Sequence, residues 1–208
     1  PVKAIAAGEG GMITTNDEKL YRRLLRLRSH GINKGADPLV RQEDAYEQGE
    51  VKRWYYEMQE IGFNYRITDI QSALALSQLQ KLEKFIERRL KLALAYDDAF
   101  AGLSRARPTQ ITGRRLSAHH LYVLQIDFDG LGRSRAKFMS ALGQDGIGTQ
   151  VHYIPVVSHP YYRSLGCKPD SFPVTQKYYG QALSIPLYYA LTDSEQAHVI
   201  AAIRRLVQ

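Results

Sequence analysis

The chain opens with Pro1-Val2-Lys3-Ala4-Ile5-Ala6-Ala7-Gly8-Glu9-Gly10-Gly11, in which a lysine stands among small apolar residues ahead of a glycine run. Burial among apolar groups lowers the pKa of a lysine because it disfavours the ammonium form. The neutral amine is the form that attacks a carbonyl carbon in covalent catalysis, and glycines let the backbone pass close to a bound group. Taken alone, these residues leave two interpretations of Lys3 open, an ordinary structural lysine or a reactive amine.

Capping residues and apolar periodicity predict the elements that follow this stretch. Thr15 and Glu18 form a capping-box pair, which predicts a helix that ends near His30-Gly31. Residues 32–60 lack a clear period and are rich in charge and tyrosine. We therefore expect a long loop with short strands, and a loop of that length is more often functional than idle.

A second capping-box pair, Thr68 with Gln71, predicts one long helix that continues to about Phe100. Such a helix spans roughly 45 Å at about 1.5 Å per residue, which suits it to joining two lobes. The polar segment 103–117, with its proline, glycine and arginines, is the expected domain boundary.

The remainder of the chain alternates between the two kinds of element. Strands are predicted at 121–126, 148–154 and 182–187, and helices at 134–144, at 173–182 and after a capping-box pair of Thr192 with Glu195. This order predicts a small α/β layer.

The composition narrows the classes of protein and of site. A single cysteine, Cys167, excludes an internal disulfide framework and a cysteine-based zinc site, and it favours a reducing cytoplasm. There is no run of about eighteen apolar residues of the kind that spans a membrane. The chain starts without a methionine, so we expect a fragment. His119-His120 is not expected to bind a metal, because neighbouring strand residues point to opposite faces.

The net charge of +7 favours anionic partners, and nucleic acid, phosphorylated cofactors and nucleotide sugars all fit it. No recognised nucleic-acid motif is present, so a basic binding module is kept only as the alternative to an enzyme. Much of the excess charge lies on the first predicted helix, where it is expected to form a solvated face or an oligomer contact: Lys19, Arg22, Arg23, Arg26 and Arg28.

Several blocks of the sequence resemble one enzyme family. Pro1-Val2-Lys3, Gly8-Glu9-Gly10-Gly11 and Thr14-Thr15-Asn16-Asp17 together resemble the signature around the pyridoxal-phosphate (PLP) lysine of the DegT/StrS-type sugar aminotransferases. Later blocks resemble the same family in the same order, across essentially the whole chain: residues 28–32 (RSHGI), 62–71 (GFNYRITDIQ), 152–155 (HYIP), 160–162 (PYY) and 183–187 (LSIPL).

The resemblance implies an α/β fold, the C-terminal part of a fold type I PLP-dependent transferase of the aspartate aminotransferase kind. Residues 1–104 are then the end of the PLP-binding large domain, with its long loop and connecting helix, and residues 105–208 the small C-terminal domain. It also implies transfer of an amino group from L-glutamate to a UDP-linked 4-keto-6-deoxy-N-acetylhexosamine. Residues 54–57 (WYYE) and the HYIP block look most like a member that acts in pseudaminic acid biosynthesis. Another nucleotide-keto-sugar aminotransferase, or an incomplete fragment that only folds, is the alternative.

The same resemblance implies roles for individual residues in a homodimer with shared active sites. Lys3 binds PLP covalently and moves a proton during the reaction. Asn64 reaches the PLP phosphate of the partner subunit, while Arg66 and Tyr153 line the substrate pocket. Two further residues are expected close to the substrate, His152 and Trp54.

Each assignment has an ordinary structural alternative. Asn64 fits a turn before a helix, Arg66 can pair with Asp69, Tyr153 fits a core position, and His152 fits an ordinary strand residue. In the family, the groups that hold the PLP ring and most of its phosphate lie N-terminal to the lysine, so this segment alone is expected to bind PLP weakly.

Overall fold

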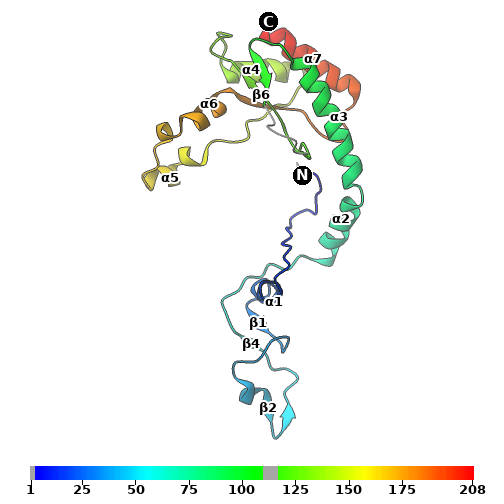
Figure 1. Cartoon of the computed structure of the whole chain (residues 1–208), viewed down its shortest axis with the longest axis vertical. Helices are drawn as coiled ribbons and strands as arrows, with labels where there is room; N and C mark the ends of the chain where they lie inside the picture. The colour runs from blue at the N-terminus through cyan, green and yellow to red at the C-terminus, as the bar shows by residue number, and fades with distance from the viewer. Residues whose placement is uncertain (1–2, 110–116) are drawn as a thin grey trace. The chain divides into compact units, whose positions relative to one another are not determined.

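The computed structural model describes residues 3–109 and 117–208 (Figure 1). Contacts divide the chain into two compact units. The first, called here the N-terminal unit, is Ala6–Gln78, and the second, the C-terminal unit, combines Pro1–Ile5 with Leu79–Gln208. Pro1 and Val2 of the lysine motif lie outside the described residues, as do residues 110–116 of the polar segment 103–117. The predicted division into domains 1–104 and 105–208 stays a prediction.

The C-terminal unit is built on a three-stranded antiparallel sheet in the order β5-β6-β7. The strands are β5 (Ala106–Pro108), β6 (Tyr122–Ile126) and β7 (Ala182–Ile185). Side chains along β6 alternate between buried and half-buried, as expected for a strand with one covered face. All four residues of β7 are buried.

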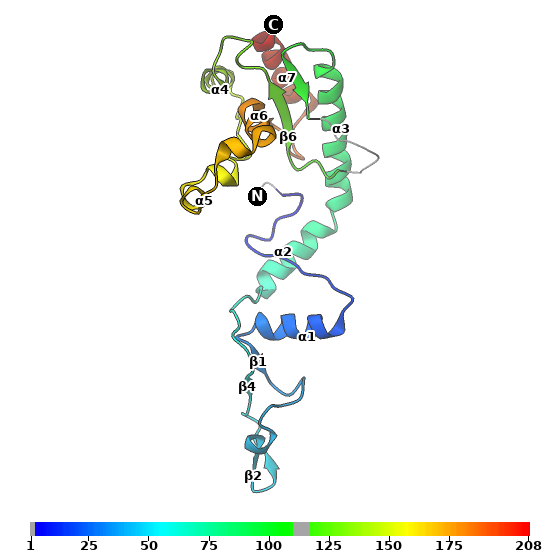
Figure 2. The same ribbon diagram turned by 60° about the vertical axis from the view of Figure 1, so that its left-hand side comes forward.

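Helices pack around this sheet: α3 (Leu82–Phe100), α4 (Arg135–Gln144), α6 (Pro173–Gln181) and α7 (Asp193–Val207). Figures 1 and 2 both show α3 and α7 side by side next to the sheet. The core contains Tyr96, Phe100, Leu124, Phe138 and Ile203, none of them more than 1% exposed. Burying such a side chain contributes about 1.5–3 kcal/mol, so this cluster holds the unit together.

Two of the three predicted capping boxes are confirmed. At α7 the Thr192 hydroxyl accepts from the Glu195 amide, and the Glu195 carboxylate accepts from the Thr192 amide at 2.8 Å. At α2 (Asp69–Leu79) the same exchange joins Thr68 to Gln71.

The third predicted box is wrong. Helix α1 (Glu18–Leu27) begins after Asp17, whose carboxylate accepts from the Lys19 and Leu20 amides at 2.9 and 3.1 Å. The Thr15 hydroxyl instead accepts from the Asp17 amide. A carboxylate nearer the helix start therefore displaces the threonine as the cap.

Two predicted elements differ from the structure. The single helix from residue 68 to 100 is two helices, α2 and α3, with a turn at Gln80 and Lys81 between them. The apolar period runs through the turn, but α2 buries no residue whereas α3 buries five, so packing decides where the helix continues. The predicted strand 148–154 is also absent. Gln150 makes only an isolated bridge to Ser184, and Tyr153 and Ile154 are exposed.

The N-terminal unit confirms the predicted long loop with short strands. After α1, strand β1 (Ile32–Asn33) pairs with β4 (Glu57–Met58), and β2 (Tyr46–Glu47) pairs with β3 (Glu50–Val51) in a hairpin. A 3-10 turn, η1 (Gln42–Ala45), leads into β2.

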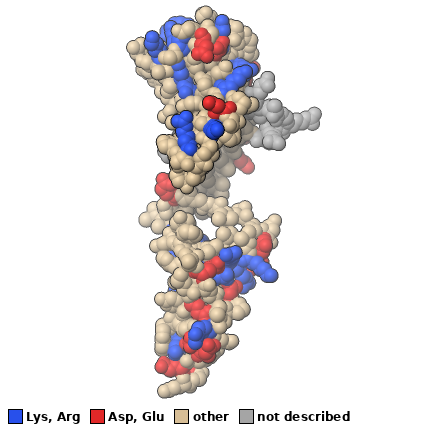
Figure 3. All heavy atoms as spheres, turned by 90° about the vertical axis from the view of Figure 1, so that its left-hand side faces the viewer, with Lys and Arg blue, Asp and Glu red and all other residues tan. Residues whose placement is uncertain are grey.

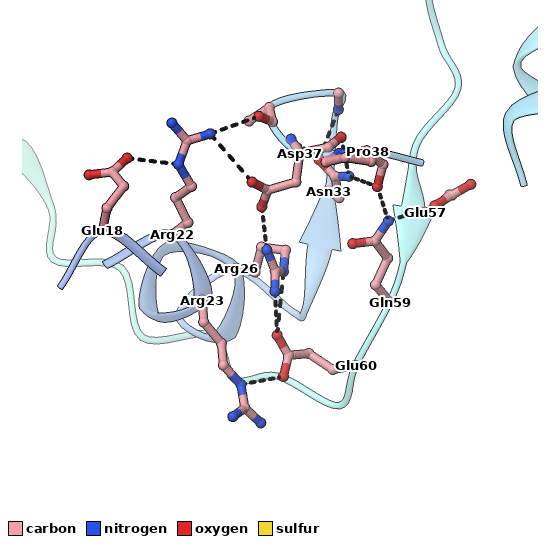
Figure 4. Close-up of polar contacts among 12 residues, drawn as sticks. Glu18, Arg22, Arg23, Arg26, Asn33, Asp37, Pro38, Glu57, Gln59 and Glu60 are labelled. Atoms are coloured by element: carbon pink, nitrogen blue, oxygen red, sulfur yellow. Dashed lines mark hydrogen bonds and ion pairs between the residues drawn. The ribbon is translucent and has the colours of Figure 1, made fainter. Parts of the chain in front are cut away.

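Ion pairs tie α1 to this loop (Figure 4). Arg26 contacts both Asp37 and Glu60, and Arg23 lies 2.9 Å from Glu60. Part of the basic helix face is therefore paired with carboxylates of its own unit.

A single carboxylate, that of Glu57, organises the middle of the loop. It accepts hydrogen bonds from the Val40 and Arg41 amides at 2.7 and 2.8 Å, from the Tyr55 hydroxyl at 3.0 Å and from the Gln59 side-chain amide at 2.7 Å. Burial acts to raise the pKa of Glu57, but the four hydrogen bonds favour the charged form and lower the pKa to about 2.

We expect Glu57→Gln to loosen residues 40–57, because a neutral amide offers one acceptor oxygen to donors that now share two. Hydrogen exchange at the Val40 and Arg41 amides, corrected for intrinsic rates, should accelerate. Since the folded-state pKa lies below the ordinary value of 4.5, the stabilisation in the native protein is complete above that value and is lost as the pH falls through about 2. Glu47→Gln, at an exposed position of β2, is the control. Unchanged exchange in Glu57→Gln would contradict this role.

Candidate functional site

Lys3, the residue at the centre of the sequence hypothesis, belongs to the C-terminal unit. Its side chain is exposed, while Ala4 and Ile5 beside it are half-buried. The expectation that small apolar neighbours bury Lys3 is therefore not met by the described part of this chain.

His120 lies near Lys3 and was not assigned a role from the sequence. Burial lowers the pKa of this half-buried imidazole, and repulsion from Lys3, from Arg89 and from the protonated form of His152 lowers it further. Lys3, Arg89 and His152 therefore all act electrostatically on His120. The His119-His120 pair precedes β6, and the sequence analysis argued only that the pair is not expected to bind a metal.

Arg89 fixes the chain around His120. The guanidinium is buried on α3, and its Nη1 donates to the carbonyls of His119, His120 and Leu187 at 3.1, 3.2 and 3.1 Å. Burial lowers the pKa of Arg89. The only sign of this role in the sequence was an arginine on the apolar face of a predicted helix. Periodicity does not say which carbonyl groups such an arginine reaches.

His152 is the second predicted residue of this neighbourhood. Its Nδ1 lies 2.8 Å from the hydroxyl of Ser184 on β7, and its ring packs edge-on against Tyr153 at 4.7 Å. Tyr153 is 66% exposed, so it is not a core aromatic. The two neighbouring rings, one anchored and one open to solvent, can form part of a binding surface.

Asn64, Arg66 and Trp54 lie in the N-terminal unit, and all three are exposed. The backbone of Asn64 forms an isolated bridge to Ser29, which holds the residue while leaving its amide side chain available. Within the described residues Arg66 forms no ion pair with Asp69, so the simplest structural explanation for this arginine is not supported.

Other features of the described residues do not form the candidate site. A hollow of about 560 Å³ beside α7 is lined by Gly146, Tyr188 and His198 among others, and it includes no predicted site residue. Between residues 3 and 109 and between 117 and 208, no three metal-ligating side chains gather. No helix in these ranges combines the length and the apolar character needed to cross a bilayer.

Relatives of known structure share this architecture. An aminotransferase of Helicobacter pylori, PseC, involved in the biosynthesis of pseudaminic acid, is 25% identical, with a TM-score of 0.78 over 93% of this chain and 47% of its own. The PLP form of a putative sugar aminotransferase, Spr1654 of Streptococcus pneumoniae, is 25% identical, with a TM-score of 0.76 over 95% of this chain and 45% of its own. The expected α/β fold, part of a fold type I PLP-dependent transferase, is confirmed.

Sequence comparison identifies the family. The spore coat polysaccharide biosynthesis protein SpsC of Bacillus subtilis is 38% identical over 208 residues, which are 99% of this chain and 51% of that protein. The chain spans about half the length of the curated relatives it matches. The model of the DegT/DnrJ/EryC1/StrS aminotransferase family matches residues 1–204. Since this match covers almost the whole chain, the protein belongs to the DegT/DnrJ/EryC1/StrS aminotransferase family.

Proposed function

We propose that the intact protein is a PLP-dependent sugar aminotransferase that moves an amino group from L-glutamate to the C4 ketone of a UDP-4-keto-6-deoxy-N-acetylhexosamine. The observation that supports it most is that the family model matches the chain from its first residue and so includes Lys3. The reaction of UDP-4-amino-4,6-dideoxy-N-acetyl-β-L-altrosamine transaminase is the specific form proposed. The similarity to the Helicobacter pylori enzyme of pseudaminic acid biosynthesis favours this substrate class.

The chemistry of the available side chains fits PLP. Lys3 offers an exposed amine for the aldehyde of the cofactor, and Asn64 offers an exposed amide that can donate to a phosphate oxygen. When bound, PLP supplies the electron sink for this class of reaction.

Lys3 also has a second task, the movement of a proton. A tethered amine can take a proton from the Cα of the amino donor and return it at C4′ of the cofactor, provided that it reaches both atoms. A neighbouring histidine that is held neutral adds no competing positive charge at this amine. Burial and the positive charges of Lys3 and Arg89 lower the pKa of His120, which favours its neutral form.

The exposed residues of the N-terminal unit suit the nucleotide sugar. Arg66 can donate two parallel hydrogen bonds to a diphosphate, and Trp54, 70% exposed, offers an aromatic face. We further propose a cytoplasmic homodimer, in which Asn64 and Arg66 act on the site of the partner subunit. Another nucleotide-keto-sugar substrate is the alternative within the family.

The face drawn in Figure 3 does not favour nucleic-acid binding. In Figure 3, acidic and basic side chains are interspersed over the face shown, without a continuous basic stripe. A stripe or patch of one sign is the usual electrostatic footprint of a nucleic-acid binder.

Lys3→Ala should abolish the visible absorption band of lysine-bound PLP in the intact protein and lower kcat by about 10³-fold, because the covalent link and the proton carrier disappear together. Absorption spectra and half-reactions with L-glutamate measure both effects. Lys34→Ala, an exposed lysine of the N-terminal unit, is the matched control. An unchanged band in Lys3→Ala would remove Lys3 from this role and the proposed function with it.

Asn64→Ala should weaken PLP retention, and mixing it with Lys3→Ala tests the shared site. If Asn64 acts across a dimer, each mixed dimer has one intact site, and random reassociation restores about a quarter of native activity for a symmetric dimer. Activity assays after subunit exchange, with each variant alone as the control, measure the recovery. Mixed dimers that recover nothing would place both residues in the same subunit's site.

Arg66→Ala should raise KM for the nucleotide sugar about 10- to 100-fold, as expected for loss of hydrogen bonds to a charged group, and leave KM for L-glutamate nearly unchanged. Steady-state kinetics with each substrate varied in turn make the comparison, and Arg204→Ala, exposed on α7, is the control. A larger effect on L-glutamate would place Arg66 at the amino-donor site instead.

A further inference from the structure

Strand β7 contains one polar side chain, Ser184, among three apolar ones, and the whole strand is buried. Ser184 is only 5% exposed. A hydroxyl buried in a sheet must find a hydrogen-bond partner, because an unpaired polar group away from water is destabilising. The partner of this hydroxyl is Nδ1 of His152, 2.8 Å away.

The backbone fixes the position of this hydroxyl from two sides. Ser184 pairs with Val123 of β6 in the sheet register. On its other side it exchanges both backbone hydrogen bonds with Gln150, at 2.8 and 3.1 Å. His152 follows Gln150 by two residues, so the same contact that anchors this irregular segment brings the imidazole to Ser184.

The hydrogen-bond requirements of the pair select one tautomer of His152. If the Ser184 hydroxyl donates to Nδ1, the imidazole proton lies on Nε2 and the buried hydroxyl is satisfied. If Nδ1 donates instead, the serine proton needs another acceptor, and the described residues supply none for it. The first arrangement therefore leaves no buried donor unpaired.

We infer that Ser184 is a positioning residue that holds His152 as the Nε2–H tautomer, so that His152 presents a hydrogen-bond donor and not a base. Within the described residues Nε2 has no partner, and the ring is only half-buried. Arg89 donates to the His120 carbonyl at 3.2 Å, and Lys3 acts electrostatically on the same histidine, as His152 does. An N–H donor in a positive field suits an anionic oxygen. The assignment of that oxygen to the nucleotide sugar rests on the proposed function.

The tautomer is tested in the intact protein without any substrate. Ring ¹⁵N–¹H correlation spectra of ¹⁵N-histidine-labelled protein, assigned with His152→Gln, should show a proton on Nε2 of His152. Ser184→Ala should give a mixture of tautomers, and Ser184→Thr, which keeps the hydroxyl, should restore the native spectrum. A proton on Nδ1 in the native protein, or an unchanged spectrum in Ser184→Ala, would overturn the inference whatever the enzyme acts on.

Steady-state kinetics test whether His152 contacts the nucleotide sugar. Ser184→Ala should raise KM for the nucleotide sugar about five-fold, as for one neutral hydrogen bond, with kcat and the half-reaction with L-glutamate unchanged and with rescue by Ser184→Thr. A tautomer change without any change in KM would refute the contact with the nucleotide sugar. If Ser184→Ala and Ser184→Thr both lower kcat and raise KM to the same extent, the cause is a packing defect and the positioning role is refuted. If the native protein shows the Nε2 proton but does not aminate any keto-sugar nucleotide, only the proposed function fails.

Discussion

The buried guanidinium of Arg89 is the constraint on which the C-terminal unit depends. Removing a charge from water is costly unless hydrogen bonds replace the lost hydration. Here three carbonyl oxygens accept from Nη1, while the buried Nε has no partner among the described residues. Two of them belong to the segment before β6, His119 and His120, and the third belongs to Leu187, after β7. One side chain of α3 therefore sets where the chain enters and leaves the sheet. Loss of the guanidinium would leave those carbonyls unpaired in a buried place.

The candidate site is attached to this framework by irregular segments. Tyr96 of α3 donates to the carbonyl of Pro186 at 2.9 Å, so the end of β7 is held by two residues of one helix. Ser184, inside the same strand, holds His152. His120 and His152 are thus placed by a rigid sheet and helix, although neither lies within a regular element. Binding residues on loops that a rigid scaffold positions are common.

The N-terminal unit is held together differently. Its polar groups form a dense network, with Glu57, Arg26 and Asn33 each bonding several neighbours, while many of its aromatic and aliphatic side chains, such as Trp54 and Tyr65, remain exposed. Hydrogen bonds to a carboxylate depend on its charge, so the order of this loop depends on pH more directly than that of an apolar core. This loop presents Trp54 from a backbone fixed by its neighbours.

The sequence by itself determined the α/β class, the family blocks and two helix starts, because capping boxes such as Thr68 with Gln71 and Thr192 with Glu195 join residues only three positions apart. It also singled out Lys3, Asn64, Arg66, Tyr153, His152 and Trp54 as candidate site residues, and the roles of all six stay predictions. Only the tertiary structure decided that the long helix divides at residues 80–81, that residues 148–154 form no strand, that Lys3 is exposed and that Ser184 meets His152. These outcomes depend on which surfaces are buried and on partners about 30 residues or more apart in the chain, and local periodicity contains no information about either.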